Sequence, residues 1–190
     1  YSSAASDVYK RQDNIIVVTI TGTLSGSYNS AEIAKKIYLE EHPNAKIHVI
    51  DSLSAGGEVD LLVRKLNHLV AEGLDFDQVV DAITTYQSKT KLLFVLAKVD
   101  NLVKNGRLSK LIGTVVGLLN IRMVGEASKT GTLELLQKAR GQKKAIKAAF
   151  DELIKAGYTG GHITIAHRNN DKFIEQFSDC LLYTSDAADE

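Results

Sequence analysis

The sequence has little cysteine, little proline and no excess of charge. Its 190 residues include one cysteine, Cys180, and one proline, Pro43, while 23 Lys and Arg balance 23 Asp and Glu. A single cysteine excludes an intrachain disulfide and a cysteine cluster for a structural metal. Zero net charge argues against a general nucleic-acid or membrane-surface binder, because such proteins usually carry a basic excess.

Long apolar segments are also missing. No apolar run reaches the ~18 residues that a membrane-spanning helix needs, and no apolar segment follows the basic pair Lys10-Arg11 as in a secretory signal peptide. The composition, 44% hydrophobic and 24% charged, is ordinary for a folded globular protein. We therefore expect a soluble cytoplasmic protein without stable membrane insertion.

The two ends of the chain differ from its middle. Residues 1–12, YSSAASDVYKRQ, and residues 180–190, CLLYTSDAADE, show neither helical nor strand periodicity. Both contain a similar run of Ser, Asp and Ala, and both resemble translated sequencing-adapter sequence. We predict that these segments are not native, that the closing helix loses its pattern at Cys180, and that the natural part is 13–179. Frayed natural termini are the alternative.

Residues 13–98 alternate strand and helix patterns. The β-branched run Asn14–Thr21, the segment Lys46–Asp51 and the run Leu92–Leu96 are each typical of a buried strand. Between them, apolar residues recur at helical spacing, first at Ile33, Ala34 and Ile37. Two further helices follow, one with a stripe from Val59 to Val70 that ends before Gly73, and one that Asp75 can cap. This alternation predicts βαβ units and a parallel sheet.

After residue 98 the pattern changes to α+β, so we place a domain boundary there. Segments Ile121–Ala127 and Thr132–Ala139 flank a turn with Gly131 and predict an antiparallel hairpin. The other expected elements of 99–179 are helices at Val99–Lys104, Leu108–Leu119 and Gln142–Ala156, a strand at His162–Ala166, and a helix from Lys172.

The segment Thr19–Ala31, TITGTLSGSYNSA, carries the clearest functional signal. A buried strand ends in two glycines and several hydroxyls, and a helix follows directly. Free backbone N–H groups and the helix dipole favour a bound anion there, and Ser25 and Ser27 can add hydroxyl donors. A turn and helix cap without a ligand would need the same residue types. The segment lacks the GxGxxG, Walker A and GxSxG patterns, so it favours neither a nucleotide nor a nucleophilic serine.

Other candidate groups give a weaker functional signal. A second strand-loop-helix, VIDSLSAGGE at 49–58, repeats the pattern at what should be the same sheet edge. We interpret Ser52 and Ser54 as turn residues in preference to ligands. The five histidines form no metal constellation, and nothing places a Ser, a His and an Asp together as a hydrolytic triad.

Five segments taken together are similar to a known family. They are TLSGSYNSA (23–31), VIDSLSAGGE (49–58), FVLAKVDNLVKNGRLSK (94–110), LLNIRMV (118–124) and KARGQKKA (138–145). Their combination resembles the DegV family of bacterial fatty-acid-binding proteins over essentially all of the natural part. The resemblance implies two α/β domains with a long acyl chain in an apolar tunnel and its carboxylate held by hydroxyl groups. It also implies a partner, because several members present the fatty acid to a separate ATP-binding subunit of a fatty acid kinase.

The resemblance also assigns residues. It makes Ser25 the carboxylate ligand, with the backbone of Gly26 and of Ser27 beside it. Arg140 matches a family arginine near either the head group or the kinase-subunit surface, and Arg107, in NGRLS, is a further contact or purely structural. No catalytic residue, metal or cofactor is implied. An N-terminal Thr-Ser segment and a glycine-rich C-terminal segment with a histidine are absent, so we expect a two-domain architecture truncated at both ends.

Two functions fit these observations. The first is a non-enzymatic carrier that binds a long-chain fatty acid with its carboxylate at the Ser25 loop. The second is an enzyme acting on a small phosphorylated or acidic substrate at the same crevice, because a phosphate would suit the loop as well as a carboxylate does. The absence of a convincing nucleophile or nucleotide loop favours the carrier.

Overall fold

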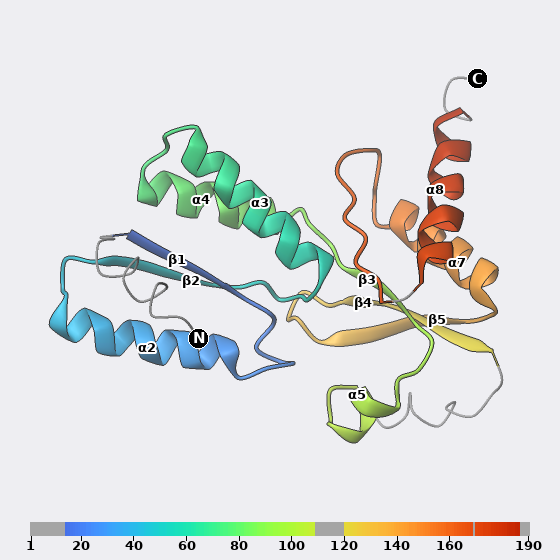
Figure 1. Cartoon of the computed structure of the whole chain (residues 1–190), viewed down its shortest axis with the longest axis horizontal. Helices are drawn as coiled ribbons and strands as arrows, with labels where there is room; N and C mark the ends of the chain where they lie inside the picture. The colour runs from blue at the N-terminus through green and yellow to red at the C-terminus, as the bar shows by residue number, and fades with distance from the viewer. Residues whose placement is uncertain (1–13, 109–119, 169, 187–190) are drawn as a thin grey trace. The chain divides into compact units, whose positions relative to one another are not determined.

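The computed structural model describes residues 14–108, 120–168 and 170–186, and it divides into two compact units, Tyr1–Thr90 and Lys91–Glu190 (Figure 1). The division lies earlier than the expected boundary at residue 98, and each unit has its own sheet. Mixed α/β architecture with a parallel and an antiparallel part is confirmed. The segments 1–13, 109–119 and 187–190, which include most of the expected helix Leu108–Leu119, lie outside the described residues.

The first unit is a two-stranded parallel sheet between helices. Strands β1 (Asn14–Thr19) and β2 (Lys46–Asp51) pair in register, so that Thr19 stands opposite Asp51 at their carboxyl ends. Helix α2 (Ser27–Glu41) lies on one face, and α3 (Gly57–Ala71) and α4 (Phe76–Gln87) lie on the other (Figure 1). The parallel pairing predicted from the sequence is confirmed. A single sheet edge therefore carries the loops that follow both strands.

The apolar core of this unit lies under α3 and α4. The predicted stripe of α3 is confirmed in part, because Leu62, Leu66 and Leu69 are buried while Val70 is exposed. Asp75 caps α4 as expected: its side chain accepts from the Gln78 amide, and the Gln78 side chain accepts from the Asp75 amide. The core cluster consists of Ile50, Leu62, Leu66, Leu69, Val79 and Ile83.

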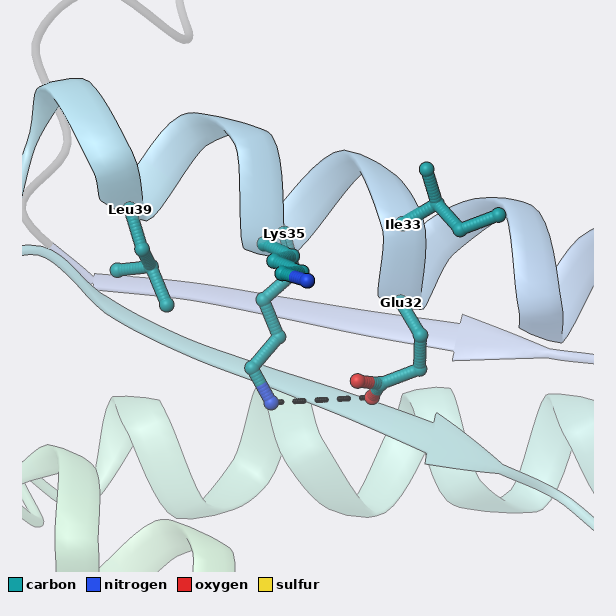
Figure 2. Close-up of a pocket in the computed structure, with 5 residues that line it drawn as sticks. Glu32, Ile33, Lys35 and Leu39 are labelled. Atoms are coloured by element: carbon teal, nitrogen blue, oxygen red, sulfur yellow. Dashed lines mark ion pairs between the residues drawn. The ribbon is translucent and has the colours of Figure 1, made fainter.

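Helix α2 directs a partly charged face toward the sheet. Ile33 and Ile37 lie on one side, as their spacing predicted, but their exposed fractions are 53% and 58%. Figure 2 shows Glu32, Lys35 and Leu39 directed toward the strands and Ile33 directed away from them. Helical periodicity indicates which residues share a face, but it does not indicate which face another element covers.

The second unit is an antiparallel sheet in the order β3-β4-β5. Strands β4 (Ile121–Ala127) and β5 (Leu133–Arg140) form the predicted hairpin, with Gly131 at φ 78° in its turn. Strand β3 (Leu93–Leu96) pairs antiparallel with β4. The expectation that Leu92–Leu96 is a third strand of the parallel sheet was therefore wrong, because a short apolar run predicts a buried strand but not its neighbour or its direction.

The described part of this unit also contains three helices. Helix α5 (Asp100–Lys104) packs on one cluster that includes Met123, and α7 (Gln142–Lys155) packs its alanines against Val124 on another. Helix α8 (Asp171–Asp186) contacts α7 through Phe177. They confirm the helices that were predicted at Val99–Lys104, at Gln142–Ala156 and from Lys172.

Two expectations for the C-terminal region were wrong. Helix α8 continues to Asp186, so helical structure does not end at Cys180. Residues 162–166 form no strand, and Ile163 and Ile165 instead pack on the cluster between α7 and α8. Their alternating apolar pattern is equally suited to an extended segment that lies on helices without pairing to a sheet.

Candidate functional site

The Ser25 loop, residues 20–26, connects β1 to α2 and is anchored at Thr21. This threonine is fully buried; its amide donates to Ser54 O at 2.8 Å, and its carbonyl accepts from Leu24 N at 3.0 Å and Ser25 N at 3.3 Å. The Thr21 hydroxyl also pairs with Thr23 Oγ1 at 3.2 Å. A tight turn with a buried anchor thus follows the strand and presents Ser25 just before the helix.

The Ser25 side chain is half-buried and oriented by the helix start. Its Oγ accepts a hydrogen bond from Ser27 N at 3.3 Å. A hydroxyl that accepts from an amide still has its own proton to donate. Ser25 is therefore placed as a donor to an acceptor group such as a carboxylate or phosphate oxygen.

The start of α2 supplies a favourable potential for an anion. Gly26 is the N-cap and has no side chain to cap the helix, and the first turn contains no acidic residue. The first helical hydrogen bond runs from Ser30 N to Gly26 O at 2.9 Å, which leaves the Tyr28 and Asn29 amides without an intrahelical acceptor. A Cβ at Gly26 would have no atom within 4 Å, so the approach to its backbone is open. This arrangement is suited to a negatively charged group.

The second loop, residues 52–56, follows β2 beside the first. Ser52 and Ser54 are buried, with 1% and 0% of their surface exposed, and the Ser52 hydroxyl bonds the Ser54 amide and carbonyl at 3.2 and 3.1 Å. Ser52 thus makes the hydrogen bonds of a turn residue, whereas the Ser54 hydroxyl has no hydrogen-bond partner among the described residues, so the interpretation of both serines as turn residues stays a prediction. Sequence reasoning missed Asp51, whose carboxylate accepts from Gly22 N; its place at the end of a parallel strand was the available signal.

The two candidate arginines belong to the second unit. Arg140 is the exposed last residue of β5 and stands opposite Ile121. It is followed by Gly141, at φ 84°, and by α7, whose first turn exposes Lys143 and Lys144. Arg107 is exposed after α5, where its amide closes a turn on Leu102 O at 2.8 Å. Both guanidinium groups lie at a surface, where a partner could reach them.

A surface groove of about 490 Å³ runs along α2, but its lining does not suit an acyl chain (Figure 2). Glu32 and Lys35 form an ion pair of 3.7 Å within it, beside Ile33, Lys36 and Leu39. An apolar ligand would have to displace water from these charges. We therefore do not assign this groove to the site.

Three further features of the described residues bear on other kinds of chemistry. In the ranges 14–108, 120–168 and 170–186, no group of three His, Cys, Asp or Glu side chains could hold a metal ion. Burial, with a smaller contribution from Lys35, lowers the pKa of His48 on β2, which favours its neutral form. None of the helices described there is long and apolar enough to cross a membrane.

Comparison with known sequences identifies the family. A profile described as "Uncharacterised protein, DegV family" matches residues 2–188. This chain belongs to the DegV family. A DegV domain-containing protein of Streptococcus gordonii is 78% identical over 169 residues, which are 89% of this chain and 60% of that protein. The chain thus spans about three fifths of the length of this relative.

Solved structures of DegV proteins share the fold. The Streptococcus pneumoniae Fatty Acid Kinase (Fak) B3 protein, loaded with linoleic acid, superposes with a TM-score of 0.89 at 72% identity, over 94% of this chain and 63% of that one. A DegV family protein from Eubacterium eligens, loaded with heptadecanoic acid, gives a TM-score of 0.86 at 40% identity, over 91% and 63%. Both of these DegV proteins hold a fatty acid.

Proposed function

We propose that this DegV chain is the major part of a fatty-acid carrier that holds the ligand carboxylate at Ser25, Gly26 and Ser27. The observation that carries the proposal is the Ser25 hydroxyl at the start of a helix with no acidic residue in its first turn, in a chain 72% identical to a structure loaded with linoleic acid. The Ser25 O–H donates to a carboxylate oxygen, and the helix start stabilises the negative charge. A long-chain fatty acid supplies that carboxylate and an apolar tail.

The protein has no catalytic role in this proposal. It presents bound fatty acid to a separate ATP-binding kinase subunit in the cytoplasm, which phosphorylates the carboxylate. Similarity to a Fatty Acid Kinase B protein supports this partner. Recovery of fatty acid from the purified protein tests the ligand, and recovery of a small phosphorylated compound would favour an enzyme acting at the same loop.

Arg140 is the residue that we propose to contact the acyl-phosphate group or the kinase subunit. A guanidinium is always charged and forms paired hydrogen bonds with phosphate or carboxylate oxygens, so the exposed position of Arg140 suits either role. Arg107 is a second, weaker candidate for the same surface.

Replacement of Arg140 by alanine should lower kinase-coupled turnover roughly tenfold, since a hydrogen bond to a charged group contributes about 1.5–3 kcal/mol. Stability should change little, because the side chain is exposed. The assay uses a full-length chimaera, in which the 169 aligned residues of this chain replace their counterparts in the Streptococcus gordonii relative. The kinase subunit of the same organism is added with ATP and oleate.

Arg140→Lys and Lys144→Ala are the controls. The first keeps the charge but loses the planar guanidinium, so it should restore turnover only partly. The second removes an exposed charge from α7 and should have little effect. Unchanged turnover in Arg140→Ala would show that this arginine contacts neither the phosphate nor the kinase.

A further inference from the structure

The two loops at the carboxyl edge of β1 and β2 are joined into one hydrogen-bonded unit. Thr21 N donates to Ser54 O at 2.8 Å, and Ser52 N donates to Thr19 O at 3.1 Å. Each of the three hydroxyl residues Thr21, Ser52 and Ser54 is at least 99% buried. The second loop therefore forms the support against which the Ser25 loop is held.

The Asp51 carboxylate bridges the two loops on their exposed side. It accepts from Gly22 N at 3.2 Å through Oδ2 and at 3.3 Å through Oδ1, and from Leu53 N at 3.0 Å through Oδ1. Leu53 has a φ of 53°, a conformation that a residue with a side chain seldom adopts without support. A carboxylate has only acceptors, which is why a single Asp51 can hold amides from both loops.

Gly22 is in close contact with this carboxylate and lies inside the turn that carries Ser25. A Cβ at Gly22 would lie 3.2 Å from Asp51 Oδ2, so glycine allows the carboxylate to approach the backbone directly. The turn closes on Thr21 O, which accepts from Leu24 N and Ser25 N. Fixing the Gly22 amide therefore fixes the peptide planes that lead to Ser25.

We propose that Asp51 is a positioning residue for fatty-acid binding: by holding the Gly22 amide, it orients the Ser25 hydroxyl toward the ligand carboxylate. This inference rests on the proposed function and adds a residue to the same site. Asp51 does not touch the ligand in this account. It acts only through the Ser25 loop.

The charge of Asp51 makes the proposal distinguishable from a purely electrostatic effect. Two like charges repel, so removal of a negative charge near a bound carboxylate would, on electrostatic grounds alone, strengthen binding. Loss of positioning would weaken binding. The two explanations thus predict opposite signs for the isosteric change Asp51→Asn. The asparagine oxygen can keep the bond from Leu53 N, but its NH2 group replaces the oxygen that accepts from Gly22 N at 3.2 Å, so Gly22 N keeps only the longer 3.3 Å contact with Oδ1, now without a negative charge.

The test measures oleate affinity of the full-length chimaera by calorimetric titration, with Asp51→Asn and Asp51→Ala made both with Ser25 present and in a Ser25→Ala background. Asp51→Asn should weaken oleate binding roughly threefold to tenfold when Ser25 is present. In the Ser25→Ala background the same change should have less than about a twofold effect, because residues that act through one another are not additive. Asp51→Ala should weaken binding at least as much as Asp51→Asn.

Asp77→Asn is the matched control, because Asp77 is an exposed carboxylate that pairs with Lys46, at the amino end of β2. It should leave oleate affinity unchanged. If Asp51→Ala fails to fold, as judged by circular dichroism, the isosteric Asp51→Asn variant decides the question alone.

Tighter or unchanged oleate binding in Asp51→Asn would overturn the positioning role, as would an equal loss in both backgrounds. Absence of oleate binding by the unmodified chimaera would overturn the proposed function, and this inference with it.

Discussion

Replacing Ser25 by alanine is expected to weaken oleate binding by the full-length chimaera about tenfold or more. The Ser25 hydroxyl accepts from Ser27 N and has its proton left for the ligand carboxylate. A hydrogen bond to a charged group contributes about 1.5–3 kcal/mol, which corresponds to a factor of about ten or more in affinity. Titration of oleate, followed by calorimetry, measures the change.

The fold should survive this substitution. Ser25 is only half-buried in a helix-entry loop, where loss of a serine costs about 1 kcal/mol even if its side chain helps to order the turn. Ser25→Thr keeps the hydroxyl and should retain most of the affinity, whereas Ser30→Ala, at an exposed position of α2, should change nothing. Wild-type affinity in Ser25→Ala would show that Ser25 does not bind the carboxylate.

The largest loss of stability is expected from Gly125→Ala. Gly125 is buried in β4 at a register shift next to Val124, opposite Leu135 of β5 and Phe94 of β3. A Cβ there would lie 2.2 Å from Glu134 O and 2.4 Å from Phe94 Cζ. Overpacking usually costs about 1–3 kcal/mol. Because one obstructing atom is a backbone carbonyl, we expect a decrease of about 3 kcal/mol or more in the free energy of unfolding.

Urea unfolding of the chimaera measures this decrease. The double variant Gly125→Ala, Phe94→Leu should recover only part of the stability, since the smaller side chain makes room on one side while Glu134 O remains in place. Gly26→Ala is the comparison, because no atom lies within 4 Å of its Cβ position. Equal stability of the Gly125→Ala and Gly26→Ala variants would mean that the sheet relaxes around residue 125.

Local structure was largely predictable from the sequence, because it depends on neighbouring residues. Capping of α4 by Asp75 and the hairpin turn at Gly131 are short-range effects, and both were confirmed. The pairing of strands and the packing of helix faces against a sheet depend on residues that are distant in the sequence. The run Leu92–Leu96 gave no sign that Phe94 would stack over Gly125, and Ile33 gave no sign that it would face away from the sheet.

The candidate site itself stays a prediction. The order strand, glycine-serine loop, helix indicated either an anion site or a plain turn, because both are made within one segment, and only the family resemblance selected Ser25 as the ligand. Asp51 was missed because its role depends on Gly22, which lies 29 residues away and becomes a neighbour only when β1 and β2 pair in register. Its place at the end of a strand indicated a position at the sheet edge but did not identify its partner.

The most direct test of the carrier assignment is the identity of the small molecules that copurify with the full-length chimaera. The protein is purified from bacterial cells, denatured and extracted with organic solvent, and the extract and the aqueous phase are analysed by mass spectrometry. The account predicts a long-chain fatty acid in the extract, in lower amount from the Ser25→Ala variant. A preparation that yields no fatty acid and takes up none when oleate is added, or one that yields a small phosphorylated compound instead, would contradict it.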